Sequence, residues 1–215
     1  MPEFSPRTLN RLSVYLRSLR HLQAQGVRRV SSRELAERYL LSATQIRKDL
    51  AQFGEFGIRG VGYNVDHLAA HLNALFGLDQ FHPLVIVGMG NLGRALVRHL
   101  GFNQGSFRVV AAVDRDPAKI GLALGDFAVR DFRNLAAVVA ESQARIGVLA
   151  VPTDEAQGGY DALVDAGIAA VLNFAPQRLR QRPEVPLKNV DLRVHLEELA
   201  FQIRDEGDPA EGADD

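Results

Sequence analysis

The chain has 215 residues, of which 47% are hydrophobic and 24% are charged, proportions that are ordinary for a folded globular protein. It contains no cysteine, which excludes disulfides, thiolate metal sites and a cysteine nucleophile. No apolar run approaches the roughly 20 residues that a membrane-spanning helix needs. Since the N-terminus also lacks a secretory signal, the sequence predicts a cytoplasmic protein that does not engage a membrane.

The net charge of −1 conceals a difference between the two ends of the chain. Residues 1–60 carry eleven Arg or Lys against five Asp or Glu, whereas the rest carries fourteen against twenty-one. A basic first quarter on an otherwise acidic protein indicates a surface that meets a polyanion. On charge alone, a solvated basic surface is an equal alternative.

Three helices are expected near the N-terminus. Leucines at helical spacing predict the first helix over about residues 5–26, and Ser31 or Ser32 caps a short second one. Ser42 stands three residues before Gln45, which is the spacing of a capping box, and opens a third helix that runs to about residue 53.

A glycine-rich stretch follows the third helix. Residues 54–62 contain four glycines with aromatic or β-branched residues between them, which favours a hairpin over a helix. A helix over residues 65–76 and a connector over 77–82 come next. Two helices joined by a short turn and followed by such a hairpin predict a winged helix-turn-helix DNA-binding domain over residues 1–79.

The third helix and the hairpin carry the side chains that we expect to contact DNA. Gln45 suits adenine and Arg47 suits guanine in the major groove, whereas Lys48 and the hydroxyl residues suit phosphates. Arg59, at the tip of the wing, could enter a minor groove or grip a phosphate. The alternative is a helical bundle that only mediates dimerisation. The expected DNA-binding residues are Ser42, Thr44, Gln45, Arg47, Lys48, Arg59 and Tyr63.

The second part of the chain alternates strands with helices. Apolar strands are expected over residues 84–87, 107–113, 146–151 and 170–172, with helices over residues 91–99 and 154–166. Residues 118–145 give a weaker pattern, with a strand near Phe127 and a helix near Leu135. This alternation predicts an α/β fold, a Rossmann-type doubly wound parallel sheet over residues 80–190.

The most specific motif is Gly88-Met89-Gly90-Asn91-Leu92-Gly93, which follows an apolar strand and opens a helix. The first glycine permits a tight turn, the second lets a pyrophosphate approach, and the third lets the helix pack against the strand. Asp114 ends the second strand, at the distance where an acid binds the adenosine ribose and favours NAD over NADP. Arg115 beside it weakens that preference. An incidental glycine-rich turn is the alternative.

Two later segments complete the expected cofactor site, at the carboxyl ends of strands. Both are mostly apolar, so we hypothesise a nicotinamide pocket that favours neutral NADH over cationic NAD+; equal affinities in a calorimetric titration would exclude it. The expected cofactor-binding residues are Gly88, Met89, Gly90, Asn91, Leu92, Gly93, Asp114, Val151, Pro152, Thr153, Asn173, Phe174, Ala175 and Pro176.

Catalysis has little support in the sequence. There is no Tyr-x-x-x-Lys, because Tyr160 is followed four residues later by Val164, and no catalytic or metal-ligating set stands out. An NAD-dependent oxidoreductase would have to use Thr153, His99 and Asn173. A nucleotide- or CoA-binding scaffold is the other open alternative, but neither accounts for the basic third helix.

The end of the chain predicts a helix over residues 191–204 and an acidic, disordered tail over 205–215. Leu192, Leu196, Leu199 and Ile203 place one apolar stripe on this helix. The stripe must be buried on its own domain or on a partner chain.

Several motifs, in order, resemble the Rex family of redox-sensing transcriptional repressors. They are Gln45 to Leu50 with Gly60 to Tyr63, Ile86 to Gly93, Leu172 to Pro176 and Asn189 to Leu192, within a likeness from about Pro6 to Ile203. The resemblance implies a homodimer that binds a palindromic operator and leaves it when NADH rises relative to NAD+. It also implies that the terminal helix is exchanged between subunits.

One position departs from the family pattern. His99 stands where the family commonly has a tyrosine, which puts any coupling role of that tyrosine in doubt and could add pH sensitivity. A flat NADH response between about pH 6 and pH 8 would exclude that sensitivity. We also hypothesise an ion pair between Arg17 and Asp191 that reports the state of the switch, to be tested by charge reversal.

Overall fold

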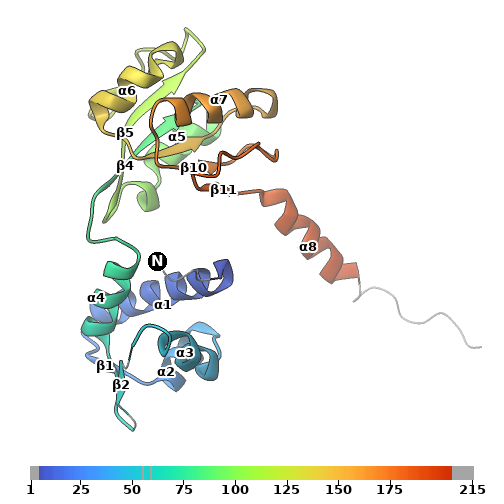
Figure 1. Ribbon diagram of the computed structural model, residues 1–215. Coiled ribbons are helices and arrows are strands. Elements are labelled where there is room, and N and C mark those ends of the chain that lie inside the picture. The colour runs from blue at the N-terminus through green and yellow to red at the C-terminus, as the bar shows by residue number, and fades with distance from the viewer. Residues whose placement is uncertain (1–4, 55, 59, 205–215) are drawn as a thin grey trace, which may run out of the picture. The chain divides into compact units, whose positions relative to one another are not determined.

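The computed structural model describes residues 5–54, 56–58 and 60–204. The chain forms two compact units that meet in sequence between Gln80 and Phe81 (Figure 1). The first unit is a winged helix-turn-helix and the second is a Rossmann-type parallel sheet, so the predicted fold class is confirmed.

Four helices make up most of the first unit: α1 Pro6–Ala24, α2 Ser32–Tyr39, α3 Ala43–Leu50 and α4 Val65–Leu75. Side-chain caps fix where they begin. Ser31 and Glu34 form a full capping box on α2, whereas Ser42 accepts a hydrogen bond from the backbone N–H of Gln45 at 3.3 Å. The side chain of Gln45 does not return to Ser42, so the predicted box on α3 is only half formed.

A small antiparallel sheet contains the wing. Its strands are β1 Arg29–Val30, β2 Gly57–Ile58 and β3 Gly62–Asn64, in the order β1-β3-β2. Gly62 adopts a φ of +84°, and a Cβ there would lie 2.6 Å from the carbonyl oxygen of Val30. The glycine is therefore needed where β3 passes β1.

The second unit contains a parallel sheet in the order β11-β10-β9-β4-β5-β8. Read from the other edge, the strands follow the chain order 3-2-1-4-5-6 of a dinucleotide-binding fold, whose ligands bind at the carboxyl ends of the strands where the order reverses. The strands are β4 His82–Val87, β5 Phe107–Asp114, β8 Arg130–Asp131, β9 Ile146–Leu149, β10 Ala170–Asn173 and β11 Leu187–Asn189.

Helices cover the two faces of this sheet unequally. On one face, α6 Leu135–Ser142 and α7 Thr153–Asp165 pack over the core that contains Val85 and Leu149. On the other, α5 Asn91–Arg98 and the 3-10 turn Leu100–Phe102 cover a smaller core. A second 3-10 turn, Phe132–Asn134, and the hairpin of β6 Ala123–Leu124 and β7 Phe127–Ala128 complete the β5–α6 region.

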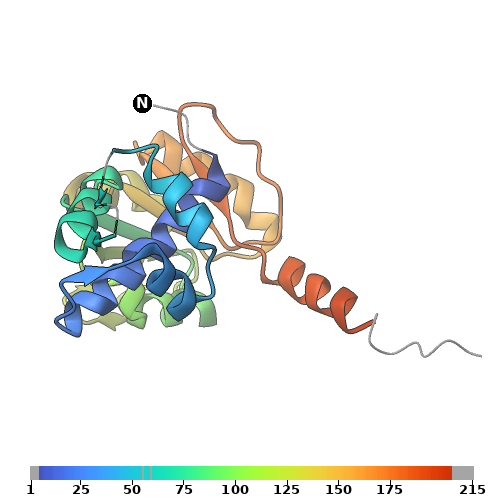
Figure 2. The ribbon, with the colours of Figure 1, turned by 90° about the horizontal axis from the view of Figure 1, so that it is seen from below.

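The last described helix is α8, Leu192–Arg204, which follows β11 (Figure 2). The predicted apolar stripe is present and uncovered in the described chain: Leu196 is 65% exposed and Ile203 is 70% exposed. None of the described helices combines the length and the apolar character needed to span a bilayer.

Adjacent glycines in α7 predict opposite effects on stability. A Cβ at Gly158 would have only the Arg115 guanidinium nearby, at 3.8 Å, whereas at Gly159 it would lie 2.9 Å from a methyl group of buried Leu149. We expect Gly158→Ala to raise the free energy of unfolding by about 0.5–1 kcal/mol, because alanine suits a helix better. Gly159→Ala should lower it, as measured by urea denaturation, and equal shifts for both variants would contradict this packing.

Candidate cofactor site and DNA-binding surface

The glycine-rich turn after β4 leaves room for a ligand at one position only. Gly88 has a φ of +96°, and a Cβ there would lie 2.5 Å from the carbonyl oxygen of Ala150. A Cβ at Gly93 would overlap the carbonyl oxygen of Gly88. A Cβ at Gly90, in contrast, would meet nothing within 4 Å beyond its chain neighbours, and no side chain caps the start of α5 there. This open helix N-terminus fits a pyrophosphate.

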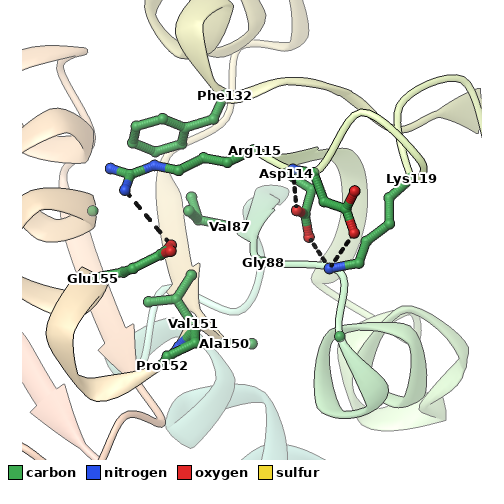
Figure 3. Close-up of a pocket in the computed structure, with 13 residues that line it drawn as sticks. Val87, Gly88, Asp114, Arg115, Lys119, Phe132, Ala150, Val151, Pro152 and Glu155 are labelled. Atoms are coloured by element: carbon green, nitrogen blue, oxygen red, sulfur yellow. Dashed lines mark hydrogen bonds and ion pairs between the residues drawn. The ribbon is translucent and has the colours of Figure 1, made fainter.

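Asp114 ties the end of β5 to this turn (Figure 3). One carboxylate oxygen, Oδ2, accepts a hydrogen bond from the Met89 backbone N–H at 2.6 Å and lies 3.2 Å from Nζ of Lys119. Oδ1 accepts from the backbone N–H of Asp116 at 2.8 Å. Burial alone would raise the pKa of Asp114, but these hydrogen bonds outweigh it and lower the pKa. The carboxylate is therefore ionised at neutral pH.

A cavity of about 410 Å³ lies between this carboxylate and the segment after β9. Five of the predicted cofactor-binding residues line it: Gly88, Gly90, Asp114, Val151 and Pro152. Its other lining residues are Val87, Arg115, Asp116, Lys119, Phe132, Ala150, Glu155 and Gly159. The predicted turn, acid and apolar segment thus meet at one site.

Three side chains that the prediction left out of the site form another wall of this cavity (Figure 3). The guanidinium of Arg115 lies over the ring of Phe132, with its carbon 4.6 Å from the ring centroid. The same guanidinium lies 3.7 Å from a carboxylate oxygen of Glu155. Arg115 follows Asp114 in sequence, but no motif marks Phe132 or Glu155, which reach the cavity from a 3-10 turn and from α7.

The other predicted cofactor-binding residues do not line the cavity. Asn173 is fully buried, and its side chain bonds the backbone of Ala175 in both directions and also Asn189, so it holds the loop after β10 in shape. The remaining predicted residues outside the lining are Met89, Asn91, Leu92, Gly93, Thr153, Phe174, Ala175 and Pro176. Met89 is buried and contributes its backbone N–H to Asp114.

Helix α3 and its N-cap, Ser42, present most of the side chains predicted to meet DNA. Ser42, Thr44, Arg47 and Lys48 are exposed. Arg47 is held in place, because its guanidinium donates to the hydroxyl of Ser32 at 2.9 Å and to that of Thr44 at 3.2 Å. It lines a groove between α2, α3 and the wing.

Two predicted DNA-binding side chains are less available than the sequence suggested. Tyr63 is only 7% exposed, so its ring packs inside the unit, and burial raises its pKa. Gln45 is half-buried and donates from its amide nitrogen to Asp49 at 2.7 Å. Arg59 lies outside the described residues.

The residues proposed for coupling lie in ordinary surroundings. His99 is exposed at the end of α5, and its Nδ1 accepts a hydrogen bond from the backbone N–H of Gly101 at 3.1 Å. A doubly protonated ring could not accept that bond. Asp191 accepts from the backbone N–H of Arg193 at 3.0 Å. The pH sensitivity and the Arg17–Asp191 pair stay predictions.

Comparison with known proteins places both units in one family. Residues 3–51 match the family described as "Putative DNA-binding protein N-terminus", and residues 79–177 match the "CoA binding domain". The chain is 43% identical to the redox-sensing transcriptional repressor Rex of Chloroflexus aggregans, over 91% of this chain and 92% of that protein. The chain belongs to the Rex family.

Solved Rex structures agree with this assignment. The chain matches RSP, a Rex-family repressor, in a crystal structure with β-NAD+ and operator DNA, with a TM-score of 0.90 and 37% identity over 96% of this chain and 95% of that one. It also matches RSP in complex with β-NADH, with a TM-score of 0.85 and 36% identity over 96% of this chain and 97% of that one. The Rex fold therefore extends through both units.

Substitutions at the second and third glycines of the motif should have different effects. Gly90→Ala places a methyl group in open space, so we expect its melting temperature to stay within about 2 °C of the wild type while NADH binding weakens at least about tenfold. Gly93→Ala forces the helix away from the strand and should lower the melting temperature itself. Thermal denaturation and calorimetric titration measure both effects, and unchanged NADH affinity in Gly90→Ala would place the pyrophosphate elsewhere.

Proposed function

We propose that this chain is a redox-sensing transcriptional repressor, which binds operator DNA through its first unit and NADH or NAD+ through its second. The observation that carries the proposal is the likeness to RSP with β-NAD+ and operator DNA across 96% of the chain. The chain's own open glycine turn, the ionised Asp114 and the exposed Arg47 and Lys48 on α3 support it. A regulator of chromosomal genes would act in the cytoplasm, as the sequence predicts.

In the cofactor site, the pyrophosphate lies at the start of α5, beside Gly88 and Gly90. Asp114 accepts from the adenosine ribose through the remaining lone pair of Oδ1, since both positions on Oδ2 are taken. Arg115 and Phe132 offer a flat surface suited to the adenine ring. The segments 151–153 and 173–176 hold the nicotinamide, whose neutral reduced form an apolar wall favours.

On the DNA side, α3 enters the major groove and the wing lies beside it. Arg47 reads a base or grips a phosphate next to α2, and Lys48, Ser42 and Thr44 contact the backbone. Arg59 stays a DNA-contacting residue predicted from the sequence alone. Tyr63, which is buried, contributes by packing the wing on the rest of the unit.

A homodimer explains two uncovered apolar surfaces. One is the stripe on α8, where Leu192, Leu196 and Leu199 are each more than half exposed. The other is a groove on the less covered face of the sheet, lined by Phe102, Phe107 and other apolar residues. An α8 exchanged between subunits would bury its stripe, and two copies of α3 would match a palindromic operator.

The switch follows from differential affinity. If NADH binds the DNA-free arrangement of the dimer better than the DNA-bound one, it shifts the population away from the operator. A hundredfold difference in NADH affinity between the two arrangements corresponds to about 2.7 kcal/mol. The bound operator then weakens NADH binding by the same factor.

A CoA-binding scaffold is the second candidate, because the model that matches residues 79–177 is named for that ligand. CoA carries a phosphate on its adenosine ribose, where the ionised Asp114 would repel it. We expect calorimetric titration to show NADH binding and no CoA binding. An oxidoreductase function is disfavoured because the relatives of this chain are named as repressors. Sustained oxidation of NADH by the pure protein would support that function instead.

The central prediction concerns release from DNA. A labelled duplex with the palindromic site from the gene's own promoter region should bind tightly in fluorescence anisotropy at fixed salt. NADH should release it at concentrations where NAD+ does little. Tight DNA binding that changes with neither NADH nor NAD+ would support the winged-helix prediction but contradict the coupling between cofactor and DNA. Absence of DNA binding, with NADH still bound, would reject the repressor.

Arg47 and Lys48 should differ in the kind of affinity that they provide. Lys48→Ala should weaken binding to every duplex alike and reduce the slope of log affinity against log salt by about 1, because it removes one phosphate contact. Arg47→Ala should cost about 1–3 kcal/mol and relax the preference at one base pair, if Arg47 reads a base. Measuring each variant on operator and scrambled duplexes over a salt series separates these two effects. If Arg47→Ala loses the same affinity on both duplexes, Arg47 contacts a phosphate.

A further inference from the structure

Asp49 on α3 is a fully buried carboxylate with four hydrogen-bond donors around it. Arg11 donates from Nε to Oδ2 at 2.6 Å and from Nη2 to Oδ1 at 2.7 Å. The hydroxyl of Tyr15 donates to Oδ2 at 2.8 Å, and Nε2 of Gln45 donates to Oδ1 at 2.7 Å. An ionised carboxylate has about four lone-pair positions, so every one of them is used.

The charge state of Asp49 decides what its neighbours can do. Burial alone would raise its pKa, but the hydrogen bonds from Arg11, Gln45 and Tyr15 outweigh the burial and lower the pKa. At neutral pH the group is a carboxylate, which accepts hydrogen bonds and donates none.

This fixes the orientation of the Gln45 amide. The oxygen and nitrogen of a glutamine amide are normally assigned from their partners, and here the partner permits one assignment. Turning the amide over would set Oε1 against an oxygen of Asp49 and remove one of the four donors. Oε1 must therefore point away from Asp49.

The Gln45 contact is not needed to join the helices. Arg11 and Tyr15 lie on α1 and already connect it to Asp49 on α3. Gln45 and Asp49 are one helical turn apart on α3 itself, so their bond links no separate elements. Its effect is to hold one half-buried side chain at the start of the helix that carries Lys48.

On the basis of the proposed DNA-binding function, we propose that Asp49 is a positioning residue for sequence recognition. It holds Gln45 so that Oε1 accepts a hydrogen bond from the exocyclic amine of adenine or cytosine in the major groove. These bases present an amine on that edge, whereas thymine and guanine present carbonyl oxygens that Oε1 repels. One base pair in each half-site is selected in this way.

The first test removes single amines from the operator. Each adenine is replaced in turn by purine and each cytosine by 2-pyrimidinone, which lack the exocyclic amine, and affinity is measured by fluorescence anisotropy. We expect wild-type protein to lose about tenfold at one position per half-site, and Gln45→Ala to lose nothing further there. Comparing both proteins on the same duplex cancels any weakening of the base pair.

The second test changes Asp49. The side-chain amide introduced by Asp49→Asn supplies an N–H, so the Gln45 amide can turn, and operators with thymine or guanine at the selected position should gain at least about fivefold relative to wild type. Tyr15→Phe is the matched control, because it removes one donor to Asp49 and leaves the Gln45 contact. It should lower the melting temperature and keep the wild-type base preference.

The outcomes separate this inference from the function on which it rests. If wild-type protein binds no operator, the proposed repressor function fails. If wild-type protein binds, but the amine-free bases lower the affinity of Gln45→Ala as much as that of wild type, then Gln45 contacts no amine and the inference is wrong. Asp49→Asn with an unchanged base preference would also overturn it. The analogue series alters no buried residue, so it decides the question even if Asp49→Asn folds poorly.

Discussion

Backbone crowding where β4 ends is the constraint on which the cofactor site depends. Gly88 passes so close to Ala150, and Gly93 so close to Gly88, that side chains cannot fit at either glycine. This contact brings β4, β9 and the start of α5 together, and it leaves Gly90 facing open space. The room for a pyrophosphate is thus the part of a tightly packed turn that the protein itself does not fill.

Each unit adds a buried carboxylate whose oxygens are occupied by donors. In the second unit, Asp114 holds the Met89 backbone and so fixes the glycine turn from the β5 side. In the first, Asp49 joins α1 to α3 through Arg11 and Tyr15. Burying an ion is costly unless its hydrogen bonds are satisfied, and both groups meet that condition. The same bonds that stabilise each carboxylate also orient the parts that face a ligand.

The sequence predicted the units, the main helices and the glycine turn because these have strong local signals, such as caps, periodic leucines and a motif in its context. It missed β1 and β11, since strands of two or three residues are too short for alternation to be visible. It did not show that Tyr63 and Asn173 are buried, and their roles toward DNA and cofactor stay predictions. Phe132 and Glu155 reach the cavity only through the tertiary fold, and no local pattern could have located them.

The two units have separate cores, and this limits how a cofactor could affect DNA binding. A change confined to the core of the second unit would leave the geometry of α3 unaltered, because Asp49 and its donors lie wholly within the first. In the proposed homodimer, coupling would then act on the distance and angle between the two copies of α3. A palindromic operator of the kind proposed would be sensitive to that spacing, so a change in arrangement would alter DNA affinity without any change inside the first unit.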